Sequence, residues 1–269
     1  MNAILKELAG AQEVEYIKIR RSKTLWLTIM AFVVLTVIGG LFMFILKDPD
    51  RARQLGLIGA KAQIFGGTAD WPNFFNLMFL LVSIGGIIIF GFIFVWIFGR
   101  EYSDKTYYDI LSLPTPRVII VIAKIITAAY WSMSLILLVF VLLLGIGLVL
   151  QLPGGSASVI LHGLTLLSGT GALTVVICIP FGFVASFTRS YLPAIGGIFL
   201  VMVLGQIISQ IGYGQYFPWN IPMMYSGAAQ ALSGKTAPPL GLVSYLLVLL
   251  VGVAAIIITG GWWRYADQT

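Results

Sequence analysis

Six long apolar segments constrain this chain more than any other feature. Each is long enough to cross the hydrocarbon core of a bilayer, which needs about 20 helical residues. They occupy residues 25–46, 77–98, 118–150, 159–187, 192–211 and 240–263. Hydrophobic residues make up 59% of the chain and charged residues only 10%, which excludes an ordinary soluble domain. We therefore expect an all-α membrane protein with six transmembrane helices, forming a single domain over residues 1–269.

The basic residues predict the orientation of these spans. An even number of spans places both termini on one side of the membrane. Most of the sixteen Lys and Arg residues lie on that same side. The opposite side carries only Lys47, Arg51, Arg53, Lys61 and Lys235. Because loops rich in Lys and Arg remain in the cytoplasm, we expect both termini to be cytoplasmic in a multi-pass protein of the cell membrane. Basic cytoplasmic loops explain the net charge of +6, so we expect no nucleic acid as a partner.

The segment before the first span, residues 1–24, has the features of a helix that lies on a membrane surface. It contains a patch of apolar residues, namely Ile4, Leu5, Leu8 and Ala11. A basic cluster follows, namely Lys18, Arg20, Arg21 and Lys23. Anionic lipids attract such clusters beside a span. We expect an interfacial elbow helix in contact with membrane lipid, although Glu15 interrupts its apolar stripe.

The loop between the second and third spans, residues 99–117, has helical periodicity. An apolar stripe is formed by Tyr102, Thr106, Ile110 and Leu113. The opposite side is charged, and Pro114 ends the helix. We predict a short amphipathic helix on the cytoplasmic surface, with Tyr107 and Leu111 exposed as contacts for a protein partner. The alternative is a solvated connecting loop. Further along, phospholipid contact suffices to explain Arg117 and Lys124, which share one helix face.

The segment before the last span, residues 212–239, combines prolines with aromatic residues. Its apolar part, residues 221–232, is too short to cross a bilayer. We predict a re-entrant or interfacial hairpin on the outer side.

The sequence predicts neither a metal site nor a nucleotide site. The chain has one cysteine, Cys178, and one histidine, His162, which makes a zinc or haem site improbable. Residues 233–236 look like the end of a phosphate-binding loop, but Ala229 stands where that loop needs glycine. We expect no cofactor bound by this chain and no ATPase activity of its own.

The spans themselves carry no charged residue near their middle. Ion-coupled carriers usually need such residues or broken helices with ion ligands, so this absence disfavours them. Gln206 and Gln210, one turn apart on the fifth span, are candidates for a polar patch on a transport path. A largely apolar path predicts a hydrophobic or amphipathic cargo.

One set of residues resembles a family signature. The set comprises Arg100, Glu101, Tyr102, Thr106, Leu111, Pro114, Arg117 and Lys124. It is similar to the signature between the second and third spans of type-2 ABC exporter permeases, although Lys105 stands where that family often has glycine. Residues 61–63 and 70–72 resemble the bacitracin-type or multidrug permeases of the family.

The resemblance implies a transport mechanism. Residues 100–113 would form a coupling helix seated in a separate ABC ATPase subunit, which binds ATP and Mg. The residues expected to couple the two subunits are Arg100, Glu101, Tyr102, Thr106, Tyr107, Tyr108 and Leu111. Two ATPase copies and a second permease, identical or related, would complete the transporter, with a path lined by the second and fifth spans. An outer gate would be formed by residues of the 212–239 hairpin, namely Tyr216, Phe217, Trp219 and Pro222.

Three functions come into question for this sequence. The first is the permease subunit of an ATP-driven exporter. The second is an ATP-independent secondary carrier or channel, which would work without a partner. The third is an intramembrane serine protease with His162 as its base, but no Gly-X-Ser-X-Gly motif occurs in the chain. We favour the exporter permease and keep the carrier as the alternative.

Overall fold

The structure, a computed structural model, describes residues 2–48, 68–104, 106, 115–228, 230 and 239–265. Six of its helices are long and apolar enough to cross a membrane. They are α2 (Lys23–Lys47), α4 (Trp71–Ser103), α6 (Arg117–Val149), α7 (Ala157–Thr188), α8 (Tyr191–Gln210) and α11 (Leu242–Tyr265). Each overlaps one of the six apolar segments, with ends that differ by a few residues, and no strand occurs among the described residues. The predicted all-α fold with six membrane-spanning helices is confirmed.

Side-chain caps fix where three of these helices begin. Ser22 accepts a hydrogen bond from the backbone N–H of Leu25 at the start of α2. Asp70 does the same for Asn73 at the start of α4, and Ser156 caps α7. These polar side chains satisfy backbone donors that the first helical turn leaves without a partner. Short polar residues at the ends of the apolar segments therefore set the helix boundaries.

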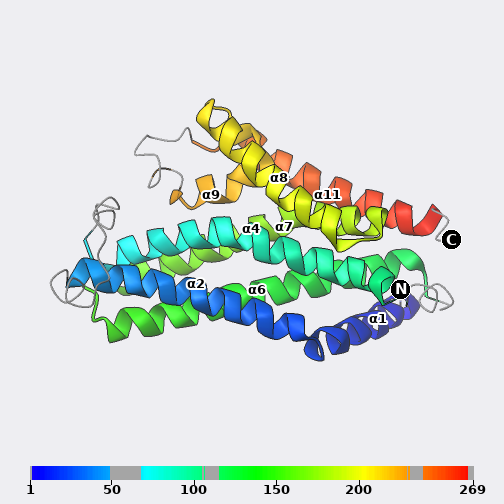
Figure 1. Ribbon diagram of the computed structural model, residues 1–269, viewed down its shortest axis with the longest axis horizontal. Helices are drawn as coiled ribbons and strands as arrows, with labels where there is room; N and C mark the ends of the chain where they lie inside the picture. Colours follow the sequence, from blue (N-terminus) through cyan, green and yellow to red (C-terminus); the bar gives the residue numbers. More distant parts are fainter. Residues whose placement is uncertain are drawn as a thin grey trace.

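Helices α4 and α7 form the centre of the bundle, and the other long helices surround them (Figure 1). Most of α4 and α7 is buried, whereas most of α2, α8 and α11 is not, as expected for helices that face lipid. Glycines allow the two central helices to approach closely. A Cβ atom on Gly163 would lie 2.3 Å from the Phe75 ring, and one on Gly182 would lie 2.7 Å from the Phe98 ring. Large aromatic side chains of α4 thus pack directly against the backbone of α7.

Both termini lie at the same end of the bundle (Figure 1). Helix α1 (Asn2–Arg20) lies at this end and packs along α6. The residues of its predicted apolar patch are not its buried face, because Ile4 and Leu5 are exposed, whereas Glu15 and Ile19 are buried. Glu15 therefore does not interrupt a buried stripe but belongs to one. That α1 lies on the membrane surface stays a prediction.

The first residues of the predicted coupling helix belong to α4 instead. Arg100, Glu101 and Tyr102 belong to the last turn of α4, which ends at Ser103. The chain turns at Asp104, and the Thr106 backbone N–H donates to the Glu101 carbonyl. A separate helix beginning at residue 100 is thus wrong. Residues 107–114, with Tyr107, Tyr108 and Leu111, lie outside the described part of the chain.

The outer segment folds into short helices at the end of the bundle opposite the termini (Figure 1). These helices are η2 (Gly214–Tyr216), η3 (Pro218–Asn220) and α9 (Ile221–Tyr225). Ile221 and Pro222 are buried against the rest of the bundle, and α9 packs on α7. The re-entrant character of this segment remains a prediction, and residues 231–238 lie outside the description.

Candidate functional site

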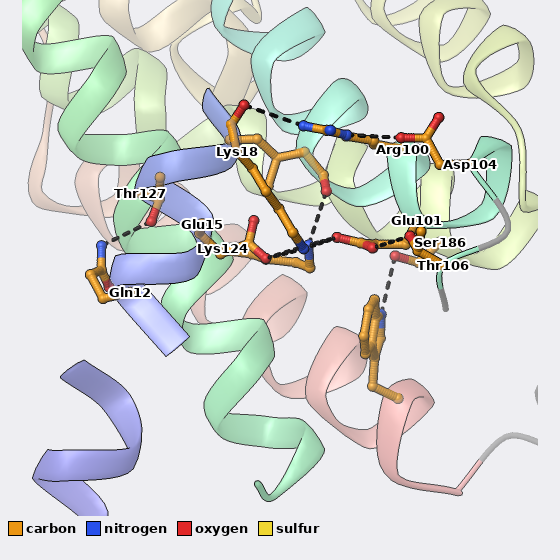
Figure 2. Close-up of polar contacts among 12 residues, drawn as sticks. Gln12, Glu15, Lys18, Arg100, Glu101, Asp104, Thr106, Lys124, Thr127 and Ser186 are labelled. Carbon is orange, nitrogen blue, oxygen red and sulfur yellow. Dashed lines mark hydrogen bonds and ion pairs between the residues drawn. The ribbon is translucent and has the colours of Figure 1, made fainter. Parts of the chain in front are cut away.

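Four charged side chains meet at the end of the bundle that carries the termini (Figure 2). Glu15 and Lys18 come from α1, and Glu101 comes from the last turn of α4. Lys124 lies about two turns after the start of α6. These four residues are called the ion cluster below. The cluster joins α1 to α4 and α6, which lie much later in the sequence.

Lys124 lies at the centre of the ion cluster. Its side chain is completely buried, and its Nζ lies 3.0 Å from Glu15 Oε1 and 2.7 Å from Glu101 Oε1. The same ammonium donates to the carbonyl of Ile97 at 3.2 Å. All three N–H donors of the lysine therefore have an acceptor. A buried ammonium needs such partners because its hydration shell has been removed.

Lys18 approaches the same two carboxylates from the edge of the cluster. Its Nζ lies 2.7 Å from Glu101 Oε1 and 3.1 Å from Glu15 Oε1. The Lys18 side chain keeps part of its surface exposed. The cluster thus holds two carboxylates and two ammonium groups, so its formal charges balance.

Glu101 connects the ion cluster to the chain that follows α4. Its Oε1 accepts from both lysines, and its Oε2 accepts from the Thr106 hydroxyl at 2.8 Å. Both the backbone and the side chain of Thr106 are thus bonded to Glu101. A displacement of the segment at Thr106 would act directly on a carboxylate that holds α1 and α6.

Further contacts bind α1 to its neighbours on both sides of the cluster. Arg100 donates from Nη1 to the Lys18 carbonyl at 3.3 Å and from Nε to Asp104 at 2.9 Å. One turn before Glu15, Gln12 donates to the Thr127 hydroxyl at 2.9 Å. Helix α1 is therefore fixed to both α4 and α6 by polar side chains rather than by apolar packing alone.

The structure brings together part of the predicted coupling set. Arg100, Glu101 and Thr106 contact α1 or each other, and Tyr102 lies half-buried beside them on α4. Phospholipid contact is the wrong explanation for Lys124, because no part of its side chain reaches the surface.

The other predicted site residues lie elsewhere. Gln206 and Gln210 are exposed on α8. The four candidate gate residues lie in the outer segment, where Tyr216 is exposed and Pro222 is buried. The rings of Phe217 and Trp219 are 5.3 Å apart, and Trp219 also meets Phe181 of α7 at 6.4 Å. The roles of these residues in transport stay predictions. Among the described residues, no group of His, Cys, Asp and Glu is arranged to hold a metal ion.

Sequence reasoning missed Glu15 and Lys124 as partners of Glu101. Two signals were present. Gln12, Glu15 and Ile19 recur at helical spacing, as the buried face of α1 does. Lys124 is a lone charge inside an apolar segment, and such residues usually face the protein interior with a partner.

Comparison with known proteins gives the family. Residues 13–206 match the family described as ABC-2 family transporter protein. The chain is also 26% identical over 178 residues to the bacitracin transport permease protein BCRB of Bacillus licheniformis. That alignment covers 66% of this chain and 85% of the relative. Because the family match spans most of the chain, this multi-pass membrane protein belongs to the ABC-2 transporter family as a membrane subunit.

Proposed function

We propose that this chain is the permease subunit of an ABC exporter and that the ion cluster transmits the movement of a separate ATPase to the membrane helices. The observation that carries the proposal is the position of Glu101. Its carboxylate is bonded to Thr106, at the start of the inner loop, and to lysines of α1 and α6. An ATPase that moved this loop would therefore pull on three helices at once.

Burial makes such a connection stiff. Separating Glu101 from Lys124 would leave a charge without a partner in a site that excludes water, which costs several kcal/mol. Helices α1, α4 and α6 should therefore move together with the loop. The ATP would be bound and hydrolysed by the partner, because residues 233–236 of this chain lack the preceding glycine that a phosphate-binding loop needs.

The cargo is proposed from the exposed surface and from the relative. The long helices are apolar, and the relative is named for the transport of bacitracin. We propose a hydrophobic or amphipathic cargo, moved outward between two permease subunits. Gln206 and Gln210 on the exposed side of α8 would face this path, and the aromatic residues of the outer segment would form its gate.

Co-purification and transport assays test the proposal. The full chain is purified in mild detergent, and a roughly stoichiometric ABC ATPase is expected with it. The complex is then reconstituted in vesicles, where ATP hydrolysis and bacitracin movement are measured. Transport by the purified chain without any ATPase would support the ATP-independent carrier instead.

Glu101→Gln separates the role of the ion cluster from that of the complex as a whole. The amide keeps the shape of the side chain but not its charge, and we expect ATP-driven transport to fall while the complex still assembles. Glu13→Gln is the matched control, because Glu13 is an exposed residue of α1. Full coupling in the Glu101 variant would contradict the proposed transmission route.

A further inference from the structure

A groove separates α6 from α11 at the end of the bundle that carries the termini. Its walls are formed by apolar side chains, and its end by Arg264 and Tyr265. The lining residues on α6 are Val118, Val121 and Ile122, and those on α11 include Ile256, Ile257, Gly260 and Gly261. The groove holds about 270 Å³ of empty space and is open at its side.

Two consecutive glycines create the space in the groove. A Cβ atom on Gly261 would meet nothing within 4 Å, and one on Gly260 would only reach van der Waals distance from Val118. Ile257, on the wall, is 67% exposed. From Ile256 to Arg264 the groove follows two turns of α11, or about 12 Å at 1.5 Å per residue. An apolar groove of this length, open at its side, fits part of an acyl chain.

Positive charge is concentrated at one end of the groove. Arg264 is exposed there, with its guanidinium 5.2 Å from the centre of the Tyr265 ring. Arg117, the first residue of α6, donates to the Trp263 carbonyl, so a second guanidinium lies beside the end of α11. Within the described ranges, neither arginine forms an ion pair with a carboxylate. Both can therefore bind an anion.

We propose that this groove binds an anionic phospholipid, with one acyl chain between α6 and α11 and the phosphate at Arg264 and Arg117. A phospholipid has its acyl chains in the bilayer and its phosphate at the surface. The groove has the same arrangement, because its apolar part lies toward the bilayer and its arginines lie at the surface. Basic pockets between transmembrane helices are known to favour anionic headgroups. The inference depends only on membrane insertion and not on the proposed coupling to an ATPase, so the two can fail separately.

Photolabelling tests the proposal with the full chain in vesicles. The probe is phosphatidylglycerol with a photoactivatable group in its acyl chain, in a background of phosphatidylcholine. Labelling is expected in the peptides that contain residues 118–122 and 256–261. Unlabelled phosphatidylglycerol should compete with the probe, whereas added phosphatidylcholine should not. Equal competition by the two lipids would overturn the assignment of an anionic headgroup.

Two variants test the two parts of the groove. Gly261→Leu should fill the groove and abolish labelling, whereas Gly196→Leu on α8 is the control, because a Cβ atom there also meets nothing within 4 Å. Arg264→Gln should weaken binding by about fivefold, and Arg264→Lys should retain most of it. Unchanged labelling in Gly261→Leu would overturn the proposal.

The assignment to lipid is also tested against a protein occupant. Ile257→Cys, with Cys178→Ala to remove the native thiol, is treated with an oxidant in vesicles. No disulfide-linked dimer is expected. Efficient cross-linking between two copies would assign this face to an interface between subunits and contradict lipid binding.

Discussion

The ammonium of Lys124 lies 2.7 Å from the carboxylate of Glu101, and both side chains are removed from solvent. The two residues belong to different long helices, α6 and α4. Their pairing is completed by Glu15 and Lys18 of α1. The first helix of the chain is thereby anchored to the bundle through charge.

Lys124→Met should destabilise the protein strongly. The substitution leaves two buried carboxylates with Lys18 as their remaining cation, and breaking a buried ion pair in this way typically costs about 3–5 kcal/mol. We expect a clear fall in the melting temperature in detergent. Lys23→Met, at an exposed lysine of α2, should melt like the wild type. The double variant Lys124→Met/Glu101→Gln should recover part of the loss, because it again balances the charges. A double variant no more stable than the single one would contradict this account of the cluster.

Thr106→Val should uncouple the inner loop and destabilise the protein less than Lys124→Met does. The variant removes the hydroxyl that donates to Glu101 Oε2 and keeps the size of the side chain. Loss of one hydrogen bond to a charged group costs about 1.5–3 kcal/mol. In the reconstituted complex we expect less cargo moved per ATP hydrolysed, and Thr106→Ser should restore the ratio. If Val and Ser variants transported equally well, the hydroxyl would have no part in coupling.

Thr127→Val should loosen α1 from α6. It removes the acceptor of the Gln12 amide, and Thr127 is buried in α6. Hydrogen–deuterium exchange should rise in the peptides of α1, while the core of α7 stays protected. Thr165→Val serves as the comparison, because the Thr165 hydroxyl bonds only within its own helix. Unchanged exchange in α1 would show that the remaining contacts hold the helix without this bond.

Labelling of single cysteines should establish the orientation. Cys178 is buried, so the native thiol gives little background. Glu13→Cys lies at the end that carries the termini, and Ser156→Cys lies in the loop before α7, and both positions are exposed. In intact cells a membrane-impermeant maleimide should react at residue 156 and reach residue 13 only after permeabilisation. The reverse pattern would invert the proposed topology and place the ion cluster outside the cell.

The number of spans and the class of the fold follow from the amino-acid sequence alone. An apolar segment of membrane length can satisfy its backbone hydrogen bonds in lipid only as a helix or in a closed barrel, so length and composition were sufficient. The residues from Arg100 to Lys124 also indicated the family, because their spacing can be read along one stretch of chain.

Which charged side chains contact one another depends on the packing of the helices. Periodicity places Glu15 on a face of α1 but cannot say which helix covers that face, and Lys124 is a lone charge whose partners lie 109 and 23 residues away. The predicted start of the coupling helix failed for the same reason. Glu101 lies in the last turn of α4, where lysines from two other helices contact its carboxylate, and the sequence of α4 does not show these contacts. The local sequence indicates that a charged side chain in an apolar segment needs a partner, but the packing of the helices determines which residue that partner is.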